Sequence, residues 1–331
     1  MNLQDKYKVY LKDIRRYSAR TVGLYSSAVD DFLEWALEDL LQPSEKDVLD
    51  VLKPNMIRGY EAHLMGGRKP RSARTVSLHL SALSGFCRFL MKEGKMKSNP
   101  VRIVPKPKIE KRLPHFFRKE AMAAYFSHTS WMLDSDALNA FISAPDTDSG
   151  KEYYDGLLAR VIVSTLYSLG IRRSELISLR VGDVDFGRNV VKVRGKGDKM
   201  REIPLIVSLS EELLLYLKAV EVMCGRKRSL TESLFVTYKG SPLYPVYVDR
   251  TVKKELEDVE GISGRRSPHV LRHSIATGLM NEDVHLNSIK EMLGHSSLAS
   301  TQVYTHTSIA RLKIIYEQAH PRAKNGGKNG D

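Results

Sequence analysis

Apolar residues recur at helical spacing through the first hundred residues of the chain. Between residues 22 and 37 they form one continuous stripe, which predicts a helix that begins after Ser18, a residue type that often caps helices. The same pattern predicts helices over residues 3–16, 54–65 and 72–93. Four helices of this length indicate a small helical bundle.

The second half is also mostly helical, but it contains a pair of strands. Residues 189–205 alternate between apolar and polar types around Gly195 and Gly197, which predicts an antiparallel hairpin with Lys196 at its tip. A further strand is expected at 234–237. Helices are expected over 118–127, 131–142, 154–169, 174–179, 209–223 and 247–259, with a polar surface excursion at 144–155 and short helical segments between 267 and 305. The predicted fold class is mainly α with a small antiparallel β-sheet.

A basic segment rich in proline separates the two halves. Residues 101–114 read VRIVPKPKIEKRLP, and proline cannot continue a helix, so an extended, semi-rigid linker is expected. A chain of 331 residues is long enough for two domains. We therefore expect a helical domain with its linker over residues 1–110 and a second domain over residues 111–331.

The charge of the chain favours a polyanionic partner. Lys and Arg outnumber Asp and Glu by 52 to 39, a formal net charge of +13, and basic side chains gain free energy by releasing counterions from a phosphate backbone. Double-stranded DNA is the first expectation, and an anionic membrane surface the second. The first 110 residues carry +7 (20 − 13) and the remainder +6 (32 − 26), which suggests that both halves clasp one duplex.

Basic residues gather in one part of the first half. Between Gly66 and Ile109, eleven Lys and Arg residues face a single acid, Glu93. A solvated helix face is the simpler interpretation, although such faces usually mix both signs. The alternative is a surface that follows DNA phosphates, with six candidate DNA-binding residues: Arg71, Arg74, Arg88, Lys92, Lys106 and Lys108.

Nothing in the sequence predicts a membrane segment or a secretory signal. The longest apolar run, residues 161–169, contains hydroxyl residues and falls far short of the about twenty residues that a membrane span needs. The first residues, MNLQDKYK, lack an apolar stretch, and the chain has only two cysteines, Cys87 and Cys224. A cytoplasmic location with no membrane partner is expected.

The richest chemistry lies between residues 267 and 305. This stretch contains His269, Arg272, His295 and Tyr304, without a pair of acids at metal-ligand spacing or a Gly-rich phosphate loop. If these side chains converge, they form a cationic cradle for a phosphate with a phenol as nucleophile. Such a site would open phosphodiesters without a metal or ATP.

Cleaving a phosphodiester with a side chain also requires charge stabilisation and a proton donor. Planar guanidinium groups match the non-bridging oxygens of the transition state, and Arg172 and Arg272 are the candidates. A lysine at a hairpin tip, Lys196, could deliver a proton to the leaving 5′ oxygen. His269 and His295 would hydrogen-bond the phosphate or assist proton transfer from Tyr304.

Each of these residues also has a simpler interpretation when it is taken alone. Tyr304 could be a half-buried core residue, Arg172 a helix cap, and Lys196 an ordinary loop lysine. His295 could simply end a helix. His269 and His273 are spaced as two zinc ligands on one helix face, but no third and fourth ligand stand at structural-site spacing.

Four segments in order resemble the motifs of the tyrosine recombinase (phage integrase) family. They are GIRRSEL at 170–176, GKGDKMREIPL at 195–205, HVLRHSIATGLM at 269–280 and LGHSSLASTQVYTH at 293–306. The similarity covers residues 160–321, and the spacings of 24 residues from Arg172 to Lys196 and 9 from His295 to Tyr304 are similar to those of Xer-type members. The chain departs from the usual motifs at Leu169, Ile275 and Gly278, and residues 128–152 form a longer segment than in compact Xer proteins.

The resemblance implies a role for each candidate. Arg172 and Arg272 would clamp the phosphate, Lys196 would protonate the leaving group, His269 and His295 would support them, and Tyr304 would be the nucleophile. Glu175 would tie the first arginine or its helix in place. Residues 1–110 would be the family's SAM-like core-binding domain, and residues 309–319 would supply the C-terminal helix that packs on a neighbouring protomer.

The resemblance also implies a reaction and an assembly. A 3′-phosphotyrosine intermediate keeps the bond energy, so no cofactor is expected, and a homo- or hetero-tetramer would exchange strands through a Holliday junction. Resolution of chromosome dimers is the expected task, with a paralogous recombinase and a septal DNA translocase as possible partners. The alternatives are the integrase of a mobile element, a type IB topoisomerase, and a DNA-binding protein without catalytic activity.

Overall fold

The computed structural model describes residues 2–40, 43–67, 70–109, 115–195 and 198–281, together with Ile289, Met292–Gly294 and Arg322. Lys196, His295, Tyr304 and residues 309–319 lie outside this described part of the chain. The chain divides into two compact units, Met1–Arg112 and Leu113–Asp331. Each unit has its own hydrophobic core.

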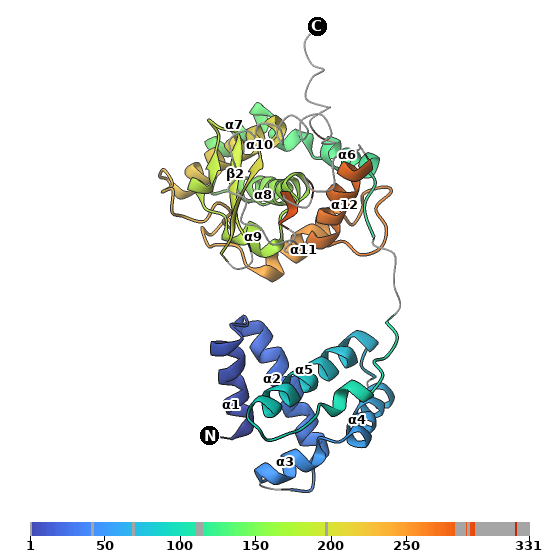
Figure 1. Cartoon of the computed structure of the whole chain (residues 1–331). Coiled ribbons are helices and arrows are strands. Elements are labelled where there is room, and N and C mark those ends of the chain that lie inside the picture. The colour runs from blue at the N-terminus through green and yellow to red at the C-terminus, as the bar shows by residue number, and fades with distance from the viewer. Residues whose placement is uncertain are drawn as a thin grey trace. The chain divides into compact units, whose positions relative to one another are not determined.

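The first unit is a bundle of helices (Figure 1). Its elements are α1 (Leu3–Val9) with the π-helical turn η1 (Tyr10–Ile14), α2 (Ala19–Ala36), α3 (Glu45–Val51), α4 (Pro54–Gly66), α5 (Ala73–Lys92) and the 3-10 turn η2 (Pro100–Ile103). Ser18 and Ser72 begin α2 and α5, and their hydroxyls accept hydrogen bonds from the backbone N–H groups of Thr21 and Thr75. The four expected helices are confirmed.

Two features of this unit differ from the expectation. The bundle has one helix more, α3, which the apolar pattern did not indicate because Val48 is the one buried residue among its seven. A reciprocal cap starts it, in which Ser44 and Asp47 each accept a hydrogen bond from the other's backbone N–H. The segment after residue 100 does not begin as an extended linker, because Val101 and Val104 are packed in the core of the bundle.

The second unit combines helices with a three-stranded antiparallel sheet, as expected for the fold class. The sheet has the order β1 (Val184–Asp185), β2 (Val190–Arg194) and β3 (Met200–Pro204). The helical elements are α6 (Lys119–His128), η3 (Ser130–Leu133), α7 (Ser135–Ser143), α8 (Asp148–Leu169), α9 (Arg173–Ser178), η4 (Val181–Asp183), α10 (Val207–Cys224), α11 (Pro245–Glu255) and α12 (Pro268–Asn281).

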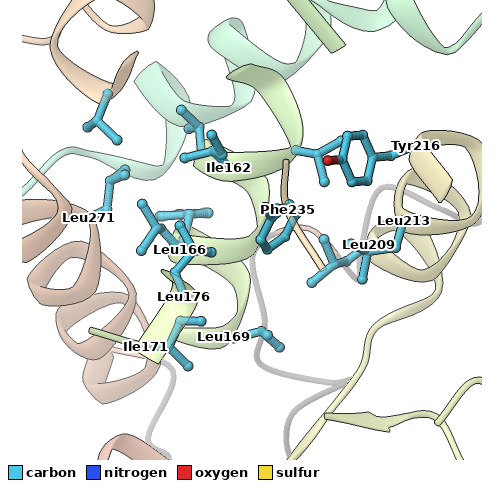
Figure 2. Close-up of a cluster of buried hydrophobic side chains, with 14 of the residues drawn as sticks. Ile162, Leu166, Leu169, Ile171, Leu176, Leu209, Leu213, Tyr216, Phe235 and Leu271 are labelled. Carbon is cyan, nitrogen blue, oxygen red and sulfur yellow. The ribbon is translucent and has the colours of Figure 1, made fainter. Parts of the chain in front are cut away.

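Helix α8 lies at the centre of the second unit (Figure 1). It contacts α7, α10, α11 and α12, and every residue from Leu157 to Leu169 is buried. Figure 2 shows Ile162, Leu166 and Leu169 of α8 among side chains that come from other elements. A helix covered on all sides carries few charged side chains, and Arg160 is the one charged residue between Leu157 and Leu169.

The structure corrects three expected elements of the second unit. Helix α8 begins at Asp148 instead of residue 154, because the hydroxyl of Thr147 caps a polar first turn. The helix expected over 131–142 is divided at Asp134, whose backbone is extended. No strand forms at 234–237; Val236 pairs with Pro242 in an isolated bridge, and proline has no N–H to extend such pairing. Within the described ranges, no helix is long and apolar enough to cross a bilayer.

Candidate active site

The end of α8 delivers Arg172 to the site. Gly170 terminates the helix in the left-handed conformation, with φ of +58°, and an added Cβ would lie 2.7 Å from Cδ2 of Leu293. Glycine is therefore required here both by its backbone angle and by the close approach of Leu293. Ile171 is buried, and Arg172 follows as the residue before α9, so its side chain leaves the core at a fixed point.

Glu175 on α9 holds Arg172 at two places. Its carboxylate accepts a hydrogen bond from the backbone N–H of Arg172 at 2.9 Å and another from the guanidinium at 2.8 Å. Burial pushes the pKa of Glu175 upward, but the hydrogen bonds and charge of Arg201 and the hydrogen bonds from Arg172 outweigh this effect, so its pKa is lowered. Glu175 is therefore a carboxylate at neutral pH, where it fixes the orientation of Arg172.

Arg272 on α12 is buried, with 8% of its surface exposed. Its guanidinium donates hydrogen bonds of 2.5 Å to the carbonyls of Gly170 and Leu293. Burial, and after it the positive charge of Arg172, lowers the pKa of Arg272 to about 10. The side chain remains a cation at neutral pH, in a place where little water screens its charge.

The turn Met292–Gly294 brings the arginines together. The guanidinium of Arg272 donates to the carbonyl of Leu293, and that of Arg172 donates to the carbonyl of Gly294 at 3.1 Å. Residues 100 positions apart in the sequence therefore bind two adjacent peptide groups. His295 directly follows this turn in the sequence but lies outside the described residues, as do Lys196 and Tyr304.

His269 lies three residues before Arg272, on the first turn of α12, and is exposed. Partial burial of its ring, followed by the positive charges of Arg173 and Arg272, lowers its pKa below the ordinary value. The ring is therefore mostly neutral at pH 7 and able to accept a proton. His273, one turn later, is also exposed. No group of three His, Cys, Asp or Glu side chains is arranged to bind a metal ion in the described part of the chain.

The six basic candidates of the first unit are all exposed. Arg74 and Arg88 lie on α5 at positions seven residues before and after Ser81, a spacing that places all three on one helix face. Lys106 reaches the same face, because its ammonium donates to the hydroxyl of Ser81 at 3.1 Å. Part of the basic segment after α5 therefore folds back along this helix. Arg71, Lys92 and Lys108 complete the set.

Sequence reasoning missed Arg201, a buried arginine of the site. It lies on β3 two residues before Ile203, and both side chains point to the same, buried face of the sheet. An arginine in an inward position of a strand was the available signal, because such a side chain needs a buried partner. That partner is Glu175, 26 residues earlier in the sequence.

A second buried polar cluster was also missed, and it surrounds Glu212 on α10. One of its carboxylate oxygens accepts hydrogen bonds from Arg160 of α8 at 2.8 Å and from Arg322 at 2.6 Å. The guanidinium of Arg322 also binds the hydroxyls of Ser164 and Ser168 and lies 3.9 Å from the ring centroid of Phe126. The C-terminal part of the chain thus inserts an arginine into the core of the second unit.

We expect Glu212→Gln to destabilise the second unit. The side chain of Glu212 is 1% exposed. Removing its charge should cost about 3–5 kcal/mol, since the arginines that it binds would stay buried without a compensating charge. Trp35 and Trp131 are the two tryptophans of the chain, one in each unit. Urea unfolding of a Trp35→Phe background, followed by Trp131 fluorescence, measures the change. Glu202→Gln, which breaks a partly exposed pair with Arg188, is the control and should cost about 1 kcal/mol or less. An equal effect of both variants would contradict this prediction.

Comparison with known proteins places the chain in a family. Residues 132–311 match the phage integrase family, and residues 5–94 match the N-terminal SAM-like domain of phage integrases. The tyrosine recombinase XerC of Chlorobaculum parvum is 32% identical over 320 residues, which cover 95% of this chain and 93% of that protein. The chain belongs to the phage integrase family.

A tyrosine recombinase from another organism supports the assignment of this chain to the family. XerC of Bacillus subtilis is 31% identical over 315 residues, which cover 95% of this chain and 94% of that protein. The resemblance to Xer-type tyrosine recombinases is therefore confirmed, and the chain is a site-specific recombinase. Solved structures share the fold. XerH bound to a palindromic difH substrate superposes with a TM-score of 0.63 at 21% identity, covering 95% of this chain and 84% of that one. A lambda integrase tetramer bound to a Holliday junction gives 0.57 at 18%, covering 92% and 79%.

Proposed function

We propose that this recombinase cleaves and rejoins DNA at the arginine site of its second unit, with Tyr304 as the nucleophile. The observation that supports this most is the pairing of Arg172 and Arg272 on the adjacent carbonyls of Leu293 and Gly294. Two guanidinium groups so placed can share one phosphate. His295 directly follows Gly294 in the sequence. The second unit, residues 111–331 in our proposal, is the catalytic domain.

The proposed reaction exchanges one phosphate ester for another. The phenol oxygen of Tyr304 forms a bond to phosphorus, the bond from phosphorus to the 5′ oxygen breaks, and the DNA 3′ end remains on the enzyme as a phosphotyrosine. Arg172 and Arg272 stabilise the charge on the non-bridging oxygens. Lys196 gives a proton to the leaving 5′ oxygen. The 5′ hydroxyl of a partner strand then attacks the phosphotyrosine and restores the phenol.

His269 accepts the proton of the Tyr304 phenol in this proposal. Tyr304 must lose its proton as its oxygen attacks, and an unperturbed phenol has a pKa of about 10. His269 has a lowered pKa because of partial burial and the charges of Arg173 and Arg272, so it is largely neutral at pH 7 and can accept a proton or a hydrogen bond. His295 forms a hydrogen bond to the phosphate in this proposal.

The first unit contributes DNA affinity in this proposal. Residues 1–110 form the core-binding domain, and the α5 face that carries Arg74, Arg88 and the docked Lys106 follows the phosphate backbone. Arg71, Lys92 and Lys108 extend the same surface. XerH was solved bound to a difH substrate and lambda integrase bound to a Holliday junction, which supports a DNA partner for this chain as well.

We further propose that four protomers exchange strands through a Holliday junction, with residues 309–319 of each packing on a neighbour. The lambda integrase tetramer on a Holliday junction supports this assembly. The XerC names of the relatives support resolution of chromosome dimers in the cytoplasm as the cellular task. A paralogous recombinase and a septal DNA translocase are the proposed further partners.

Covalent capture tests this function. The wild-type protein is mixed with a pool of nicked duplexes that have a randomised core, and the DNA that stays attached to denatured protein is sequenced. We expect one consensus site, with the DNA joined through its 3′ end and therefore resistant to a 3′-exonuclease. A supercoiled plasmid without that site should remain supercoiled. Absence of an adduct would refute the proposal, and relaxation of the plasmid would indicate a topoisomerase instead.

A further inference from the structure

We propose that Arg201 is a positioning residue for the phosphate-clamping arginines, which it orients through Glu175 and through the turn Met292–Gly294. The inference rests on the proposed function of Arg172 and Arg272. Arg201 itself is directed away from solvent, with 7% of its surface exposed, and it lies beside Val193 of β2 in the sheet. With so little exposed surface, Arg201 would act on the reaction through its neighbours.

Arg201 and Glu175 form a two-pronged ion pair. Nη1 of the arginine donates to Oε1 of Glu175 at 3.2 Å, and Nη2 donates to Oε2 at 2.8 Å. Arg172 supplies two more donors to the same carboxylate, its backbone N–H and its guanidinium. The carboxylate thus accepts four hydrogen bonds and has no freedom to rotate. Arg201 therefore sets the orientation of this carboxylate, and the carboxylate in turn sets the orientation of Arg172.

The third donor of Arg201 binds the turn that holds the other two arginines. Its Nε donates to the carbonyl of Met292 at 2.9 Å, so three arginines bind three consecutive carbonyls: Met292 by Arg201, Leu293 by Arg272 and Gly294 by Arg172. Carbonyls at the end of a helical turn lack internal partners, so cationic donors are favoured there. Because Arg201 is a residue of β3, its bond to Met292 fixes the position of this turn relative to the sheet.

Close packing ties Gly294 to Arg201. Gly294 has φ of +65°, and a Cβ added to it would lie 3.2–3.4 Å from Nη1, Cζ and Nε of Arg201. The flat guanidinium therefore lies against the glycine backbone. A lysine at position 201 would keep the charge but has neither the planar fork nor the three fixed donors. Geometry, and not charge alone, is the contribution expected from Arg201.

Kinetics on the site mapped by covalent capture test the inference. Adduct formation is measured in single turnovers at saturating protein, and affinity is measured separately by fluorescence anisotropy on the intact duplex. Arg201→Gln should slow adduct formation on the order of 100-fold, because a small misplacement of catalytic groups has this effect, while the dissociation constant changes by about twofold or less. Arg201→Lys should fall between Arg201→Gln and the wild type.

A matched variant and a double-mutant cycle complete the test. Arg188→Gln removes the exposed partner of Glu202, the residue next to Arg201 on β3, and should cleave at the wild-type rate. Because part of the effect of Arg201 passes through Glu175 and part through the turn Met292–Gly294, the double variant Arg201→Gln/Glu175→Gln should lose less rate than the product of the two single losses. Effects that multiply would contradict the proposed route through Glu175.

Each outcome separates this inference from the proposed function. A wild-type protein that forms no adduct refutes both. A wild-type protein that forms the adduct, with Arg201→Gln at the same rate, refutes only the inference. If Arg201→Gln melts below the assay temperature, Arg201→Lys decides: a wild-type rate in that variant also refutes the inference, because the fork geometry would then be dispensable. Parallel loss of affinity and rate would indicate a general structural role and refute it too.

Discussion

Tyr304→Phe is expected to bind the mapped DNA site with unchanged affinity and to form no covalent adduct. The substitution removes one oxygen atom and leaves the ring, so packing is preserved while the proposed nucleophile is lost. A nicked duplex, from which the short cleaved strand diffuses away, accumulates the adduct of the wild-type enzyme. Denaturing gel electrophoresis of the labelled duplex measures the yield.

Tyr244→Phe is the matched control for this loss. Tyr244 is an exposed phenol of the second unit, at the start of α11, and it has no proposed part in the reaction. This variant should form the adduct at the wild-type yield. An adduct in Tyr304→Phe at that same yield would mean that a different side chain attacks the phosphate.

Arg272→Ala is expected to keep most of its DNA affinity and to lose cleavage by at least about 100-fold. The loss follows from removing a donor that stabilises transition-state charge, an effect on the order of 10²–10³ in rate. Affinity should change little, because one phosphate contact is a small share of a large basic interface. Single-turnover adduct formation and anisotropy titrations on the mapped duplex measure the two quantities.

A second arginine controls for lost packing in Arg272→Ala. Arg266, six residues earlier, also donates to backbone carbonyls, those of Leu256, Glu257 and Ile262. Arg266→Ala therefore removes a comparable set of hydrogen bonds and should leave the cleavage rate near that of the wild type at a temperature where the protein is folded. Equal loss of binding and cleavage in Arg272→Ala would instead identify a structural arginine.

Local signals in the sequence predicted many of the helices and their ends. Ser18 and Ser72 start α2 and α5, and Gly170 ends α8, because each of these residue types satisfies a backbone requirement of a helix terminus. The helix α3 and the early start of α8 were missed for a related reason. Their first turns are polar, and caps at Ser44 and Thr147 stabilise them instead of a buried stripe.

The order of the motifs in the sequence identified the candidate site residues, but it did not predict contacts between distant segments. Arg172 and Arg272 were candidates from their neighbours in the sequence, and the structure adds that adjacent carbonyls hold them. Arg201 and Glu212 escaped notice because their partners lie 26 and 52 residues away, and helical or strand periodicity carries no information over such separations. The catalytic roles of all the candidate residues remain predictions, and Lys196, His295 and Tyr304 lie outside the described part of the chain.

The insertion of Arg322 bears on how this protein can be altered. Glu212, Ser164 and Ser168 are core residues of the second unit, and all three bind a guanidinium supplied from 18 positions beyond Tyr304. A truncation before Arg322 would remove one of the two guanidinium groups that bind Glu212, the same group that binds Ser164 and Ser168. Affinity tags and fluorescent fusions should therefore leave Arg322 in place, since its guanidinium binds core residues of the second unit.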